Sequence, residues 1–231
     1  RELRVLSVTG FKQLALQDTF LNETLVVFFS APIDPASVHR DSARVVDEAG
    51  ATVSGRFSVQ RDRLLFEPRL PTDAALDDGS FTPGGTYTVE LSGFPLPDGL
   101  RSLAGAPLDR PWRGSFTVAS GEPLFDDPTL GRGELLVLES LEIPPTGPVR
   151  LRCSEPLDPR SIQSARFSLR RLARAQGGDD GVLVERLVPL AAELEANDID
   201  GASLLLWPVD STADPELLQQ TYGYQVAGFG Q

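Results

Sequence analysis

The chain has 231 residues, a net charge of −12, 41% apolar residues and 23% charged residues. The apolar content excludes a disordered chain, and the negative charge disfavours nucleic acids and anionic membrane surfaces, which would be repelled. One Cys, one His and no Met exclude an internal disulfide and a four-ligand Cys/His zinc site, and leave only His39 for a mechanism with a histidine base.

Short apolar runs separated by Gly, Pro, Asp and Ser follow one another along the chain. Many of them are rich in β-branched or aromatic residues, and some alternate. This pattern is typical of an all-β sandwich or barrel. Strands are expected in the first half at residues 25–29, 51–59, 64–66, 86–91 and 115–118. No apolar run approaches the ~20 residues that span a bilayer, so membrane insertion is not expected.

The second half of the chain repeats landmarks of the first half in the same order. Residues 29–38 read FSAPIDPASV and residues 153–162 read CSEPLDPRSI. The repeat predicts two copies of one β unit. Three further matches are Ser-Ala-Arg at 42–44 and 164–166, Leu-Leu-x-x-Pro at 64–68 and 204–208, and Tyr-x-Val at 87–89 and 224–226.

The repeat decides the structure predicted for residues 164–176, whose composition also permits a helix. Because its partner in the first copy reads as a strand, SARFSL at 164–169 is expected to be a strand. In this alignment Val45 corresponds to Phe167.

The predicted domains are residues 1–119 and residues 134–231. Between them, residues 120–133 are rich in Gly, Pro and Asp and are expected to form a linker. The second domain is expected to begin with a strand at 135–138. It stops soon after its Gly-Phe pair and is expected to lack the last strand of the first domain, so that a strand from a neighbouring subunit could complete it.

The combined pattern Ser-x-Pro-[Ile/Leu]-Asp-Pro-x-Ser-[Val/Ile], Leu-x-Phe-x-Pro and Thr-Tyr-Thr-Val resembles the bacterial Ig-like domain of the SbsA type, which is known from S-layer and other secreted surface proteins. The resemblance covers residues 3–118 and, less completely, residues 134–229, where the second copy has an insertion at 172–181. It implies two tandem Ig-like antiparallel β-sandwiches on an extracellular, cell-surface or periplasmic bacterial protein. It implies no catalytic residues.

Elementary preferences explain the Asp-Pro motif without a ligand. Asp158 is placed to cap a short helical turn that begins at Pro159, and Asp34 is placed in the same way in the first copy. Val38 and Ile162 are expected to close these turns onto the core. The lone Cys153 aligns with Phe29, an inward strand position, and is expected to be a small buried apolar residue.

Three apolar residues occupy positions that should face outward. Val26 and Phe28 align with the arginines at 150 and 152, and Trp207 aligns with Glu67. Such residues indicate one covered face per domain. A domain junction or a loop is the preferred cover, with a partner protein as the alternative, so Val26, Phe28 and Trp207 are the candidate interface residues.

Cofactor chemistry finds little support. The Asp pairs at 77–78, 126–127 and 179–180 are predicted to be solvated turns, and His39 is predicted to be exposed. Residues 197–201 (NDIDG) resemble part of a calcium loop but lack the distal Glu of an EF-hand, and a hairpin is preferred. No cofactor is expected, with calcium here or at residues 126–127 as the alternative.

The sequence therefore predicts a non-enzymatic structural or adhesive module of a bacterial secreted, surface or envelope protein, which acts as a spacer or assembly unit through edge strands and apolar outer patches. Its expected partners are another protein, copies of itself, or other domains of a longer chain. The alternative is an accessory module of a secreted enzyme, for example one that binds polysaccharide. Because Tyr87 and Tyr224 share one repeat position and favour a core role, only Trp112, Trp207 and Tyr222 are left for a sugar platform.

Overall fold

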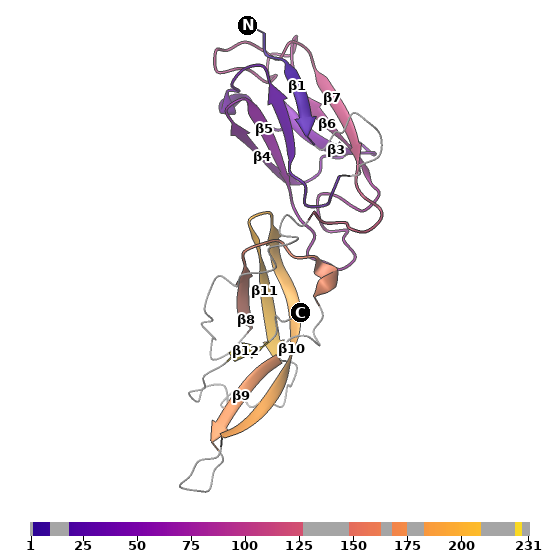
Figure 1. Cartoon of the computed structure of the whole chain (residues 1–231). Helices are drawn as coiled ribbons and strands as arrows, with labels where there is room; N and C mark the ends of the chain where they lie inside the picture. The colour runs from indigo at the N-terminus through magenta and orange to yellow at the C-terminus, as the bar shows by residue number, and fades with distance from the viewer. Residues whose placement is uncertain are drawn as a thin grey trace. The chain divides into compact units, whose positions relative to one another are not determined.

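The computed structural model describes residues 2–9, 19–126, 148–162, 168–174, 183–208 and 225–227. The chain divides into two compact units, shown in Figure 1. Unit 1 comprises Arg1–Pro71 and Ala75–Gly133, and unit 2 comprises Thr72–Ala74 and Glu134–Gln231. Over the described residues no helix is long and apolar enough to cross a membrane.

Unit 1 is a sandwich of two antiparallel sheets. One has the strand order β1-β2-β5-β4 and the other β3-β6-β7. This is the arrangement of a constant-type immunoglobulin domain, in which the first, second, fifth and fourth strands face the third, sixth and seventh. The strands are β1 (Val5–Thr9), β2 (Leu25–Phe29), β3 (Ala43–Asp47), β4 (Gly55–Gln60), β5 (Arg63–Pro68), β6 (Thr86–Leu91) and β7 (Trp112–Thr117).

The core of unit 1 follows from the alternation of its strands. Along β2, every second residue is buried, and the same holds along β6. The rings of Phe81, Tyr87 and Phe116 lie together in the interior, with centroids 4.9–5.7 Å apart. Segments outside the strands also contribute, since Leu3 and Leu108 are fully buried. Burying each such side chain stabilises the fold by about 1.5–3 kcal/mol.

The described residues of unit 2 form an antiparallel sheet of order β12-β9-β10-β11-β8. Its long strand β10 pairs with β9 through Leu183–Pro189 and with β11 through Leu190–Asp198. Val149, Leu151 and Cys153 alternate inward along β8 and contribute to the core. The strands are β8 (Val149–Cys153), β9 (Ser168–Arg174), β10 (Leu183–Asp198), β11 (Gly201–Pro208) and β12 (Gln225–Ala227).

The strand pairs within unit 1 and within unit 2 have the same register when the two units are aligned by their repeated motifs. Leu25 pairs with Phe66 in unit 1, and Val149 pairs with Leu206 in unit 2. Four residues further along each strand, Phe29 follows Leu25 and Cys153 follows Val149, so Cys153 is equivalent to Phe29, as the sequence predicts. Cys153 is 3% exposed, so its expected burial is confirmed. The match between residues 64–68 and 204–208 is therefore a match of structure as well as of sequence.

The register extended from the Ser-Ala-Arg match is wrong by two residues in β9. Val45 pairs with Val89 on β6, and Leu169 pairs with Val226 on β12, so Val45 corresponds to Leu169 when the Tyr-x-Val segments are equated. The neighbouring strands give the same result. Val53 and Val188 are equivalent, because each lies four residues before the partner of the equivalent residues Phe66 and Leu206. Val45 accepts a hydrogen bond from the N–H of Val53, and Leu169 pairs with Val188. Three shared residue types were too short a motif to fix this register.

Of the strand expected at 164–169, Ser168 and Leu169 lie in β9, and the helical alternative for residues 164–176 is excluded over Ser168–Arg174. Residues 163–167 lie outside the described part, and so does the strand expected at 135–138.

Candidate functional site

The Asp-Pro motif forms the same short 3-10 turn in both units. In unit 1 the turn is η1 (Pro35–Ser37), and the Asp34 carboxylate accepts a 3.0 Å hydrogen bond from the N–H of Ala36. The Ser37 hydroxyl donates to the Asp34 carbonyl at 2.7 Å, and the N–H of Val38 donates to the Pro35 carbonyl at 3.1 Å. This confirms the predicted cap.

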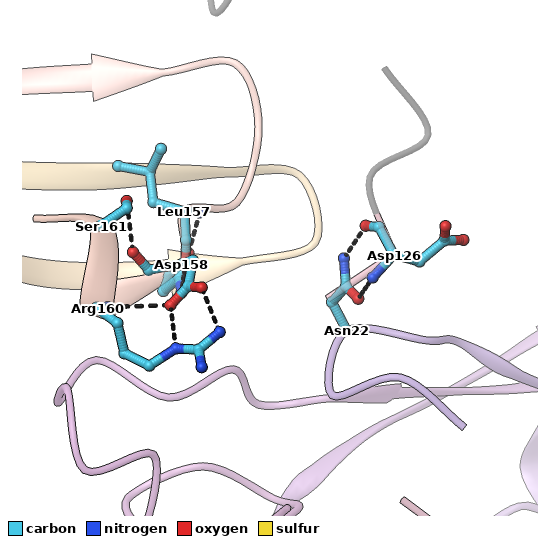
Figure 2. Close-up of polar contacts among 7 residues, drawn as sticks. Asn22, Asp126, Leu157, Asp158, Arg160 and Ser161 are labelled. Atoms are coloured by element: carbon cyan, nitrogen blue, oxygen red, sulfur yellow. Dashed lines mark hydrogen bonds and ion pairs between the residues drawn. The ribbon is translucent and has the colours of Figure 1, made fainter. Parts of the chain in front are cut away.

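Unit 2 repeats these contacts in η2 (Pro159–Ser161), as Figure 2 shows. Asp158 accepts from the N–H of Arg160 at 3.0 Å, and the Ser161 hydroxyl donates to the Asp158 carbonyl at 2.7 Å. Here the arginine side chain adds an ion pair of 2.6 Å to the second carboxylate oxygen. Both oxygens are thus engaged locally. Val38 and Ile162 pack on the cores of their units, as expected.

The loop before each turn is tied down in two different ways. In unit 1 the N–H groups of Ile33 and Asp34 donate to the backbone carbonyls of Arg61 and Arg101 at 2.8 and 2.9 Å. In unit 2 the N–H of Leu157 donates to the Asn197 side-chain oxygen at 3.0 Å, and the Asn197 amide returns a 2.8 Å bond to the Leu157 carbonyl.

Asn197 is therefore a structural clamp, and the sequence analysis missed this role. Its side chain is 3% exposed. The segment around it is a hairpin, as preferred, because Asp198 pairs with Gly201 across the turn. Glycine is required there, since a Cβ on residue 201 would lie 2.4 Å from the Cys153 carbonyl oxygen.

No group of three or more His, Cys, Asp or Glu side chains in the described part of the chain could hold a metal ion. The other calcium alternative includes Asp127, which lies outside that part. His39 is exposed, as predicted, and its backbone N–H donates to the hydroxyl of Ser42 at 2.9 Å. Burial raises the pKa of the Cys153 thiol, which disfavours the nucleophilic thiolate.

The candidate interface residues of unit 1 lie on the outer face of the β1-β2-β5-β4 sheet. Val26 and Phe28 alternate with the buried residues of β2 and are half-buried themselves. The guanidinium of Arg63, which pairs with Phe28 across the strands, lies 5.1 Å from the centre of the Phe28 ring. This cation–π contact gives Phe28 a cover from within its own sheet.

Trp207 is the candidate interface residue of unit 2. It is 44% exposed on β11, and its partner across the strands is Ala191. At the equivalent position of unit 1, Glu67 forms a 2.6 Å ion pair with Arg56. Unit 2 thus replaces an ion pair by a large aromatic ring beside a small side chain. The role of these residues as an interface stays a prediction.

Three exposed apolar side chains between β6 and β7 were not expected. Phe94, Leu96 and Leu103 are 62%, 51% and 67% exposed in the segment between β6 and β7. Arg101 holds this segment by donating to the carbonyls of Pro97 at 2.9 Å and Gly105 at 3.3 Å. The hydrophobicity of these three exposed residues would suggest that they belong to the core. Nothing in the sequence distinguishes them from Leu100 and Leu108 nearby, which are buried.

No protein-family model matches the chain, and no curated protein is significantly similar to it. Among solved structures, native alpha-2-macroglobulin from Escherichia coli, spanning domains MG0-NIE-MG1, aligns at a TM-score of 0.42 and 15% identity, over 100% of this chain and 67% of that one. The N-terminal part of the bacterial S-layer protein SbsC aligns at a TM-score of 0.36 and 16% identity, over 90% of this chain and 44% of that one. The immunoglobulin arrangement of unit 1 follows from its own strand order and does not depend on these alignments.

Proposed function

We propose that this chain is a non-catalytic structural module of a bacterial secreted or surface protein, which acts as a spacer or an assembly unit. The observation that carries the proposal is that the same capped turn follows an equivalently paired strand in both units, with the polar residues of the motif engaged in the fold. Asp34 and Asp158 are the acidic residues of the repeated motif, and each caps its own turn. The bacterial surface location rests on the resemblance of the repeated motif.

The proposed contact surfaces are the outer sheet faces, at Val26 and Phe28 in unit 1 and at Trp207 in unit 2. The edge of the β1-β2-β5-β4 sheet at β4 is less suited to this role. The described edge strand β4 carries Arg56, which forms an ion pair with Glu67, and charged residues on an edge oppose strand addition. Large aromatic residues, in contrast, are frequent anchors of protein interfaces.

Trp207 also supports a second candidate, an accessory module that binds polysaccharide. Its ring is open to solvent beside Ala191, which would suit stacking on a sugar ring. The other aromatic residues give less support. Tyr87 is buried and Trp112 packs against the core of unit 1, while Tyr222 and Tyr224 lie outside the described residues.

A pull-down with insoluble polysaccharides (peptidoglycan, cellulose, chitin and starch) separates the two candidates. The structural proposal predicts no retention of the full chain on any of them. It also predicts that Trp207→Ser leaves the melting temperature unchanged and lowers the sedimentation coefficient measured at high protein concentration, because a contact between copies is lost. Retention that disappears in Trp207→Ser would replace the structural proposal by the polysaccharide-binding one.

A further inference from the structure

Two exposed apolar turns lie in the segment between β6 and β7 of unit 1. They are residues 94–97 (Phe-Pro-Leu-Pro) and residues 103–105 (Leu-Ala-Gly), and together we call them the apolar loop. Five large apolar side chains are exposed in the described part of the chain, and three of them, Phe94, Leu96 and Leu103, belong to this loop. One such side chain on a surface is ordinary, but three in one loop indicate a contact surface.

Hydrogen bonds hold the apolar loop in one arrangement. The N–H of Phe94 donates to the Leu108 carbonyl at 2.8 Å. The guanidinium of Arg101 joins the two turns, because it donates to the carbonyl of Pro97 at 2.9 Å and to that of Gly105 at 3.3 Å. A surface that is already ordered loses little conformational freedom on binding, which favours its use as a contact.

Two opposite charges flank the apolar loop. Asp98 follows its first turn, and Arg110 lies on the other side of Gly93; both are exposed. The backbones are close, since a Cβ on residue 99 would lie 2.9 Å from the Gly93 Cα, and a Cβ on residue 93 would lie 2.7 Å from the Arg110 carbonyl oxygen. Over the described residues, neither the Asp98 nor the Arg110 side chain forms an ion pair or a hydrogen bond.

We propose that the apolar loop binds the same loop of a second copy of the chain, in a contact with two-fold symmetry. In such a contact a surface meets its own copy and must be complementary to itself. The apolar side chains meet this condition, and so do the charges, because Asp98 of each copy faces Arg110 of the other. A different partner would be served by one sign of charge, whereas a self-contact needs both. The contact extends the proposed assembly role by a surface separate from the outer sheet faces.

Sedimentation of the full chain tests the contact. Trp207→Ser is included throughout, so that the sheet-face contact proposed above does not contribute. The loop has far fewer than the roughly 20–30 residues per side of a standard interface, so the dimer should be weak, with a dissociation constant on the order of 100 μM. Leu103→Ser should raise this constant at least tenfold, because both copies lose a buried apolar side chain.

Leu6→Ser is the matched control. Leu6 is 66% exposed, against 67% for Leu103, but it lies on β1, outside the loop. Its substitution should change the dissociation constant less than twofold, and both serine variants should keep the melting temperature. An equal effect of the two variants on association, or none for Leu103→Ser, would overturn the proposal.

Charge exchange makes the test specific to a two-fold contact. Asp98→Arg and Arg110→Asp should each weaken self-association roughly tenfold, because like charges then meet twice. A mixture of these two variants should associate about as strongly as the chain with both residues intact, because opposite charges face each other again.

Single variants that self-associate as before, or a mixture that does not associate, would overturn the proposal. Neither result would alter the difference that Trp207→Ser makes in the otherwise unchanged chain. A failure of the loop contact is therefore distinguishable from a failure of the proposed function.

Discussion

Units 1 and 2 share the register of their described core strands but differ in the turn that follows β3 in unit 1 and β9 in unit 2. In unit 1 the turn after β3 is short, and the Asp47 carboxylate closes it by accepting from the N–H of Ala51 at 2.8 Å. In unit 2 the corresponding hairpin continues to the pair Arg174–Leu183, and β10 becomes a strand of 16 residues. Core packing thus constrains register strongly, while a surface hairpin can lengthen without disturbing it.

The two units also differ in how far a single side chain holds the loop before the Asp-Pro turn in place. The loop before the Asp-Pro turn is held by backbone carbonyls in unit 1 and, in unit 2, by the Asn197 side chain, which bonds both backbone groups of Leu157. Unit 2 should accordingly be the more sensitive to a single substitution in this region. Each unit contains one tryptophan, Trp112 or Trp207, so fluorescence in a background where the other is Phe follows one unit at a time.

Phe29→Cys should have the largest effect, because it gives unit 1 the residue that unit 2 has at the same position. Removing most of a fully buried ring should cost about 3 kcal/mol of the unfolding free energy of unit 1, measured in urea by Trp112 fluorescence. Cys153→Ala, the matched change in unit 2, removes one sulfur and should cost about 1 kcal/mol. Equal costs would show that the two positions are not comparably packed.

Asn197→Ala should follow. It leaves the N–H and the carbonyl of Leu157 without their amide partner and should destabilise unit 2 by about 2 kcal/mol, measured by Trp207 fluorescence. Ser203→Ala is the control, because its more exposed hydroxyl donates only to Glu195 at 3.0 Å. A cost for Asn197→Ala no greater than that of the control would refute the clamp role of Asn197.

Asp34→Ala and Asp158→Ala test whether the repeated motif has one role. Loss of the cap should cost about 1 kcal/mol in each unit, and the Asn variants, which also cap, should cost much less. The ion pair with Arg160 adds at most about 0.5 kcal/mol at the second position, because it is partly exposed. If Asp158→Ala left the stability of unit 2 unchanged while Asp34→Ala destabilised unit 1, the motif would not have the same role in the two copies.

The smallest effect concerns pH. The hydrogen bond from Arg150, made at 2.6 and 2.8 Å, lowers the pKa of Glu195 in unit 2. A carboxylate with a lowered folded-state pKa stabilises the fold above its unfolded pKa, near 4.3, and this contribution is lost as the pH falls through the folded value. Glu195→Gln should reduce the stability of unit 2 by no more than about 0.5 kcal/mol at pH 7, and this reduction should shrink as the pH falls through the folded-state pKa of Glu195. A stability difference between the two chains that grew toward low pH would contradict a lowered pKa of Glu195 in the folded state.

Local patterns explain why much of the fold could be predicted. The Asp-Pro caps and the inward place of Cys153 depend on alternation and on neighbours within a few positions. The role of Asn197 could not be recognised, since its partner lies 40 positions away along the chain. The Ser-Ala-Arg match gave the wrong register for β9 for a different reason: three residues of common types can recur without sharing a register.

The central claim is that one β scaffold is used twice in one register. Disulfide formation tests it most directly, because antiparallel partners have Cα atoms about 4.5–5.5 Å apart, within the range that a disulfide spans. In a Cys153→Ala background, Leu169→Cys with Val226→Cys should crosslink in the folded chain, as Val45→Cys with Val89→Cys should in unit 1. Phe167→Cys with Val226→Cys should not. A crosslink in the Phe167 pair and none in the Leu169 pair would contradict the common register.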